Sequence, residues 1–148
     1  MNRRDFSALL PLLAAATALT PEAGAQTAAA HLNQLSSGAY PPAPPKAPPT
    51  APRISRSFLL GLLPGDIRLE AHETHLAPGA PPEPVNHHKH SEIWLMREGR
   101  ATLTAGGKTV ILQPGDMGLC VAGEDHTITN ASQSEPASYF VITVGPPE

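Results

Sequence analysis

The residues best suited to chemistry lie in one short run, 85–92, with the sequence VNHHKHSE. Three of the chain's seven histidines fall within four positions of this run, and Glu92 follows two positions after the last of them. Successive side chains of a strand point to opposite faces. If the run is extended, His88, His90 and Glu92 therefore share one face, and His87 points the other way. Two imidazoles and a carboxylate on one face are suitable ligands for a divalent transition metal.

Another ligand must come from elsewhere in the chain, and the candidate is His126 in the segment 123–130, GEDHTITN. The sequence thus predicts a site for Fe, Mn, Zn, Ni or Cu that is formed by His88, His90, Glu92 and His126. A solvated histidine cluster without function is the alternative. The second histidine-bearing segment, roughly thirty residues further on, favours the metal site.

Two further histidines lie in the segment 67–76, IRLEAHETHL. On a strand, His75 would share a face with three apolar residues, which indicates an inward direction, although an exposed strand end is the simpler interpretation. His72 would share a face with Arg68 and Glu70, so we expect it to point outwards.

Residues 1–25 have the features of a twin-arginine signal peptide: RRDF at 3–6, an apolar region at 8–19 and the small residues AGA at 23–25. A retained amphipathic helix is the alternative. Cleavage after Ala25 would leave no stable membrane anchor, because this signal is an address that a receptor reads. We therefore expect a periplasmic or extracellular protein.

Residues 26–53 are predicted to be a linker or arm, since the run 40–52 is dominated by proline. Proline lacks an amide proton and fixes φ, which favours an extended polyproline-II conformation. We expect no ladder hydrogen bonds from this run and few apolar contacts. The sequence leaves open whether the arm docks on the following domain or on a partner subunit.

From residue 54 to 148 the chain alternates between short apolar runs and turn signals such as PGD, GG and AG. This pattern predicts eight strands, at 54–63, 67–76, 92–97, 101–105, 109–112, 117–121, 126–130 and 137–144. No window has helical periodicity beyond a turn or two. So many short strands in one domain indicate an all-β closed barrel or a double-sheet jelly roll.

The composition of the chain indicates which binding partners and covalent links to expect. The net charge of -3 is small and dispersed, so it gives no case for nucleic acid or an anionic membrane. The single cysteine, Cys120, excludes an intramolecular disulfide and lies in an apolar run, which predicts a buried structural thiol. Several strands are apolar on both faces, and the core is small. We therefore expect a homodimer that covers one of these faces.

Two motifs resemble those of the cupin superfamily. Gly79, Glu92 and Gly99 fit the first motif, with the correct six-residue gap between the last two. The segment 115–130 fits the second motif, except that Val121 replaces a proline. The resemblance covers about residues 54–145. It implies a small jelly-roll β-barrel, commonly dimeric, whose usual metal ligands are two first-motif histidines, the glutamate and the second-motif histidine.

The first motif departs from the family pattern at one ligand. Counting three residues back from Glu92 places the His-x-His pair on Asn86 and His88, and counting four places it on Val85 and His87. Neither count gives two histidines. Asn86 is a poor donor for a transition metal, so we expect His90 to take the place that Asn86 vacates.

The resemblance implies a metal-binding protein that acts on a small oxygenated molecule. Dioxygenase, isomerase and decarboxylase chemistries all occur on this barrel, and the fold does not select among them. The alternative is a non-catalytic module that binds a small molecule. Asn86 favours this alternative, because weakened ligation matters less where no reaction depends on it.

Overall fold

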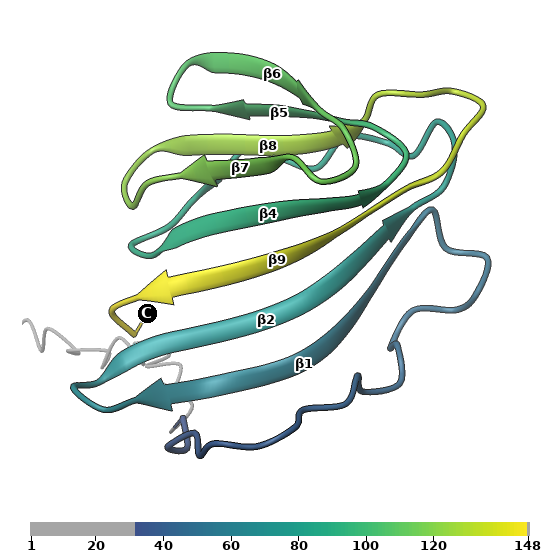
Figure 1. Cartoon of the computed structure of the whole chain (residues 1–148). Helices are drawn as coiled ribbons and strands as arrows, with labels where there is room; N and C mark the ends of the chain where they lie inside the picture. The colour runs from purple at the N-terminus through teal and green to yellow at the C-terminus, as the bar shows by residue number, and fades with distance from the viewer. Residues whose placement is uncertain (1–31, 148) are drawn as a thin grey trace, which may run out of the picture.

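The computed structural model describes residues 32–147, and those residues form nine strands and no helix (Figure 1). The predicted signal peptide lies outside the described residues, as does the start of the arm. The strands are β1 (Arg53–Leu63), β2 (Ile67–Leu76), β3 (Asn86–His87), β4 (Ser91–Glu98), β5 (Ala101–Ala105), β6 (Lys108–Leu112), β7 (Met117–Cys120), β8 (Asp125–Asn130) and β9 (Ala137–Gly145). Among residues 32–147 there is no helix long and apolar enough to cross a membrane.

The strands form two antiparallel sheets that make a jelly-roll barrel. One sheet has the order β1-β2-β9-β4-β7, and the other has the order β3-β8-β5-β6. The last strand, β9, thus lies between β2 and β4, far from its neighbours in sequence (Figure 1). The predicted all-β jelly-roll class is confirmed.

The eight predicted strands are present, and none of their ends differs from the predicted one by more than one residue. The ninth strand, β3, escaped prediction because two residues are too few to show a period. Residues 88–90 lie between β3 and β4, with a bend at 89 and 90, so the extended run assumed across the histidines is interrupted there. Strand alternation therefore does not by itself set the direction of His88 and His90.

The side chains of β4 on the Glu92 face point into the barrel. Trp94 and Met96 are buried, at 2% and 1% exposure, and belong to the apolar core. Burial of side chains of this size contributes about 1.5–3 kcal/mol each. Gly99 ends the strand with φ at 69°, and a Cβ there would lie 2.1 Å from the carbonyl oxygen of Pro136. Glycine is therefore required at the position where the first motif ends.

The side chains of β2 that face the barrel interior are not the set that hydrophobicity suggested. Thr74 and Leu76 are buried, His72 is partly buried beside the barrel interior, and His75 is exposed. The expectation that His72 points outwards is wrong, whereas the exposed strand-end position favoured for His75 is confirmed. The apolar residues of β2 misled the inference about His72 because they contribute to an apolar outer face of the sheet.

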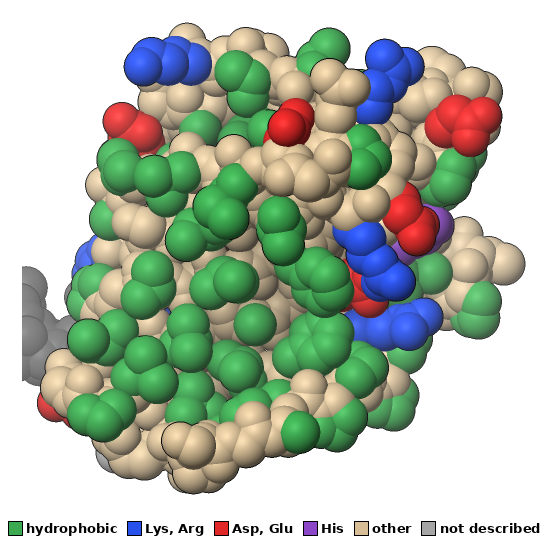
Figure 2. All heavy atoms as spheres, in the orientation of Figure 1, with side chains coloured by type: hydrophobic (Ala, Val, Ile, Leu, Met, Phe, Trp, Pro, Cys, Tyr) green, Lys and Arg blue, Asp and Glu red, His purple; other side chains and the backbone are tan. Residues whose placement is uncertain are grey.

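The outer face of the five-stranded sheet is rich in exposed apolar side chains. Leu95 pairs with Met117, and Ile93 pairs with both Leu119 and Ile142, which places these residues on one face. Four of them are 38–66% exposed. Figure 2 shows hydrophobic side chains gathered over this sheet. We call this surface the apolar outer face.

The arm lies along the free edge of β1 (Figure 1). The Leu35 amide donates to the Leu62 carbonyl (2.7 Å), and the Leu62 amide donates to the Asn33 carbonyl (2.9 Å). The Ala43 amide donates to the Ser57 carbonyl (2.8 Å). Within the proline-rich run, Ala43 thus makes one backbone hydrogen bond to β1, while the isolated bridge between Gln34 and Leu62 lies before the run. The arm docks on its own barrel and covers a strand edge that could otherwise pair with another chain.

Gly61 permits this docking, and its replacement should release the arm. A Cβ at Gly61 would lie 2.6 Å from the Asn33 carbonyl oxygen and 2.8 Å from the Leu35 side chain. We expect Gly61→Val to lower the unfolding free energy by about 1–3 kcal/mol through overpacking. Trypsin should also cleave the variant faster after Lys46. Gly38→Val is the matched control, because a Cβ there meets nothing within 4 Å. Equal cleavage rates in both variants would contradict the docking.

Candidate metal centre

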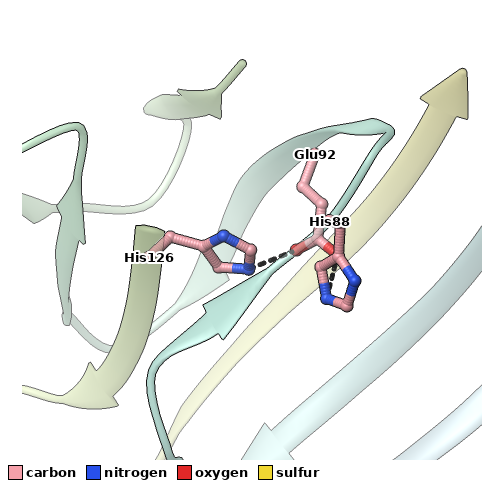
Figure 3. Close-up of side chains that lie close together, drawn as sticks. All are labelled: His88, Glu92 and His126. Carbon is pink, nitrogen blue, oxygen red and sulfur yellow. Dashed lines mark ion pairs between the residues drawn. The ribbon is translucent and has the colours of Figure 1, made fainter. Parts of the chain in front are cut away.

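Three side chains from separate parts of the chain converge at one end of the barrel interior (Figure 3). His88 comes from the connection between β3 and β4, Glu92 is the second residue of β4, and His126 is the second residue of β8. One potential ligand atom from each lies within 4.8 Å of the others. The structure therefore brings together three of the four residues that the sequence predicted as ligands.

The carboxylate of Glu92 lies between the imidazoles. His126 Nε2 is 3.2 Å from Glu92 Oε2, and His88 Nε2 is 3.8 Å from Glu92 Oε1. The side chains of Glu92 and His126 are 13% and 5% exposed, whereas that of His88 is 31% exposed. The group thus has a buried floor and a more open side.

The fourth predicted ligand, His90, contacts the carboxylate but lies outside the three-residue group. Its Nε2 is 3.3 Å from Glu92 Oε1, and its ring stacks on that of His88 with centroids 4.5 Å apart. His90 is buried at 5% exposure. The structure therefore places His90 beside the centre, and the ligand role predicted for it stays a prediction.

The two possible alignments of the first motif place their residues in different parts of the structure. Asn86 pairs with His126 across β3 and β8, and it lines the same cavity as Glu92. His87 is exposed and its Nδ1 is 3.0 Å from Asp125 Oδ1, while Val85 is also exposed. The three-residue count, which aligns Asn86 and His88 with the motif, agrees with this geometry. The prediction that His87 points away from the site is confirmed.

A cavity of about 170 Å³ opens beside the three-residue group, and we call it the inner cavity. Its residues come from both sheets: Arg53, Ser55, His72, Thr74, Glu83, Asn86, Glu92, Trp94, His126, Ile128, Tyr139 and Val141. The Trp94 ring lies against that of His126, with centroids 5.3 Å apart. The cavity therefore joins a polar group at one end to an apolar wall.

Tyr139 supplies a neutral hydroxyl to the inner cavity. Burial raises the pKa of Tyr139 to about 12, although the adjacent Arg53 opposes that shift. Arg53 Nη1 donates to the Tyr139 hydroxyl (3.0 Å) and forms an ion pair with Glu83 (2.5 Å). At neutral pH the phenol keeps its proton, which it can donate to a bound molecule.

Cys120 pairs with Glu92 across β7 and β4 but does not join the group. Its side chain is buried, as predicted, and its Sγ lies 3.6 Å from the carbonyl oxygens of Val121 and Glu124. Burial raises the pKa of the Cys120 thiol, and the nearby carboxylate of Glu124 raises it further. The thiol is therefore protonated and unreactive at neutral pH.

The donor set fits a divalent transition metal. Two imidazole nitrogens and one carboxylate oxygen are borderline ligands that Fe, Mn, Zn, Ni and Cu accept. Their mutual distances within 4.8 Å allow one ion to contact all three after small side-chain movements. The Nδ1 of His126 is buried and has no hydrogen-bond partner among the described residues, so Nε2 is its polar contact with the site.

Residues 72–143 match the family model described as the cupin domain. This match spans both motifs and all the predicted ligands. Over these residues the barrel resembles the cupin domain. The match supports the resemblance to the cupin superfamily that the sequence indicated. No curated protein matches the chain significantly.

Solved structures agree on the fold. An RmlC-like cupin from Shewanella frigidimarina is 16% identical, with a TM-score of 0.55 over 74% of this chain and 85% of that one. A cupin 2 conserved barrel protein from Salinispora arenicola is 22% identical, with a TM-score of 0.50 over 62% and 74%. A predicted oxalate decarboxylase from Thermotoga maritima is 18% identical, with a TM-score of 0.50 over 62% and 79%. At these identities the comparison establishes the fold alone.

Substitution of the histidines should separate ligands from neighbours. We expect His88→Ala and His126→Ala to reduce metal affinity at least tenfold, because few donors share the binding free energy. His87→Ala is the matched control and should bind metal like the parent protein. The measurement is competition for Zn²⁺ against a chromophoric chelator. Loss of affinity in His87→Ala would overturn the assignment.

His90→Ala is the informative variant in the same assay. A loss similar to that of His88→Ala would identify His90 as a fourth ligand. Unchanged affinity would leave three strong donors, and Asn86→His should then tighten binding by restoring the usual cupin set.

Proposed function

We propose that this protein is a metal-dependent cupin that binds a small oxygenated molecule in the inner cavity and acts on it as an enzyme. The observation that carries the proposal is the group of His88, Glu92 and His126, which borders a cavity closed by buried core residues. A divalent metal ion held by these three residues would act as a Lewis acid toward a carboxylate or enediol oxygen of the substrate, or would bind dioxygen.

The remaining cavity residues would orient this substrate. The neutral hydroxyl of Tyr139 donates a hydrogen bond, and Arg53 provides a positive charge whose position is fixed by Glu83. Trp94 limits access of water to His126 from the core side. These residues favour a ligand with at least two oxygen atoms, one for the ion and one for the hydroxyl donor.

A small carboxylate is the first ligand to test, because one of the structures with this fold is described as a predicted oxalate decarboxylase. Protein loaded separately with Mn²⁺, Fe²⁺, Ni²⁺, Cu²⁺ and Zn²⁺ would be incubated with oxalate and other small carboxylates. We expect the parent protein to bind about one metal ion per chain and to consume a carboxylate when it is loaded with at least one of these metals. Glu92→Ala should lose both the bound metal and the activity, whereas His87→Ala should keep both. Absence of stoichiometric metal from the parent protein would contradict the proposal.

A non-catalytic binding module is the second candidate, and the position of Asn86 favours it. Asn86 lines the inner cavity at the place of a usual histidine ligand, so the centre has one strong donor fewer. Tight, saturable carboxylate binding without substrate loss under any metal would support this candidate over the enzyme.

We also propose export by the twin-arginine route, on the basis of the signal features in residues 1–25. The protein would then act in the periplasm or outside the cell, without a stable membrane anchor. Intact mass of the protein recovered from the periplasm, with the chain expected to start at Gln26, is the measurement.

We propose further that the apolar outer face pairs with a second copy of the chain. Contiguous exposed apolar surface of this kind usually marks an interface, and a stable dimer buries about 800 Å² per partner. Light scattering at micromolar concentration should give twice the chain mass. Leu119→Glu should give the monomer mass, whereas Ile111→Glu, an exposed apolar residue of the other sheet, should not. A monomeric parent would exclude the dimer.

A further inference from the structure

The proline-rich arm forms one wall of a second cavity beside the inner cavity. This space has a volume of about 430 Å³, and we call it the outer chamber. The arm contributes four residues to it: Ala43, Pro44, Lys46 and Ala47. Strands β1 and β2 contribute the opposite wall: Arg53, Ser55, Ser57, Glu70 and His72. The arm therefore forms one side of this space.

The outer chamber and the inner cavity meet at shared residues. Arg53, Ser55 and His72 line both spaces, while Glu92 and His126 line the inner cavity. The two spaces are therefore adjacent, and His72 lies where they meet. A ligand that occupied both would have one end beside the group of His88, Glu92 and His126.

The two spaces differ in polarity. The inner cavity carries the ligand group and the Tyr139 hydroxyl. On the arm side, the chamber is lined by the methyl groups of Ala43 and Ala47 and the ring of Pro44, with Lys46 as the charged exception. Since proline has no amide proton, this wall offers few donors to a polar ligand. It suits the hydrocarbon part of a ligand whose polar end lies inside.

Backbone hydrogen bonds hold the arm wall in place on both sides of the chamber. The Ala43 amide donates to the Ser57 carbonyl on one side, and the Ala77 amide donates to the Pro52 carbonyl (2.8 Å) on the other. Proline residues between these points further restrict the backbone. The wall is thus formed before any ligand arrives, which lowers the entropy cost of binding.

His72 is held at the junction by its neighbours on β2. Its Nδ1 lies 3.3 Å from Glu70 Oε1, and Arg68 Nη2 donates to Glu70 Oε2 (2.5 Å). Hydrogen bonding by His72 lowers the pKa of Glu70, and the charge of Arg68 lowers it further. The ionised carboxylate therefore lies beside the His72 ring where the two spaces meet.

We propose that the arm is part of the substrate site and that the substrate is a carboxylate with an apolar tail of several carbons. Its carboxylate lies in the inner cavity and its tail lies against Ala43, Pro44 and Ala47. This inference rests on the proposed function, in that the metal centre is what holds the carboxylate. It adds that the arm determines which carboxylates bind best.

The test uses straight-chain monocarboxylates from acetate to octanoate as probes of the full chain. Trp94 is the only tryptophan and lines the inner cavity, so its fluorescence reports binding. Titrations of Zn²⁺-loaded and metal-free protein should show affinity that rises about fourfold with each added methylene until the chamber is filled. Ala47→Phe should abolish that rise and leave acetate binding unchanged. Thr50→Phe, an exposed arm residue outside the chamber, is the matched control and should keep the rise.

Each outcome of these titrations supports or overturns the arm wall, and the dependence on metal tests the proposed function separately. If affinity rises with chain length in the parent protein and not in Ala47→Phe, the arm wall is supported. If the same rise occurs in metal-free protein, the arm wall is still supported, but the result counts against the metal function. Carboxylate binding that needs metal but ignores chain length overturns the arm wall and leaves the metal function intact. Absence of binding in both forms overturns the arm wall. An equal loss in Thr50→Phe also overturns it, because the effect would then not come from the chamber.

Discussion

The contacts of the Glu92 carboxylate connect the sequence motifs to the fold. A carboxylate that is only 13% exposed inside a barrel is costly unless hydrogen bonds or positive charge compensate it. Imidazoles from the connection before β4 and from β8 surround this group, so the two sheets must meet where Glu92 lies. An ion would compensate the same charge. The motif residues therefore report on sheet pairing as well as on metal binding.

The sequence predicted the strands well because most of them carry an apolar period and end at glycine or proline turns. It also identified His88, Glu92 and His126, since motif spacing fixes which residues reach the barrel interior. The prediction failed where the apolar pattern of a strand does not match the set of side chains that is buried. In β2 most apolar residues lie on the outer face, while Thr74 and His72 lie on the inner face with Leu76, which departs from the rule that apolar side chains point inwards. Hydrophobicity alone cannot distinguish an interface from a core.

The sequence left the docking of the arm open, and the reason is again physical. Proline content excludes regular ladder pairing over a whole segment, but it does not exclude the few amides that remain, such as that of Ala43. Gly61 provides space for the backbone near Asn33, a close approach that no local pattern reveals. A segment interpreted as a spacer is thus structured by tertiary contacts, and it changes the shape of the space beside the site.

The position of β9 has a consequence for how the protein is made. Because Ala137–Gly145 lies between β2 and β4, the five-stranded sheet cannot form until the last strand has left the ribosome. The β1-β2 hairpin must wait for a partner about seventy residues away in sequence, and pairings of such long range form slowly. During that interval the edge of β2 is exposed to other chains. Folding of this domain is therefore completed only after β9 has been released from the ribosome, and its yield depends on protection of the β2 edge.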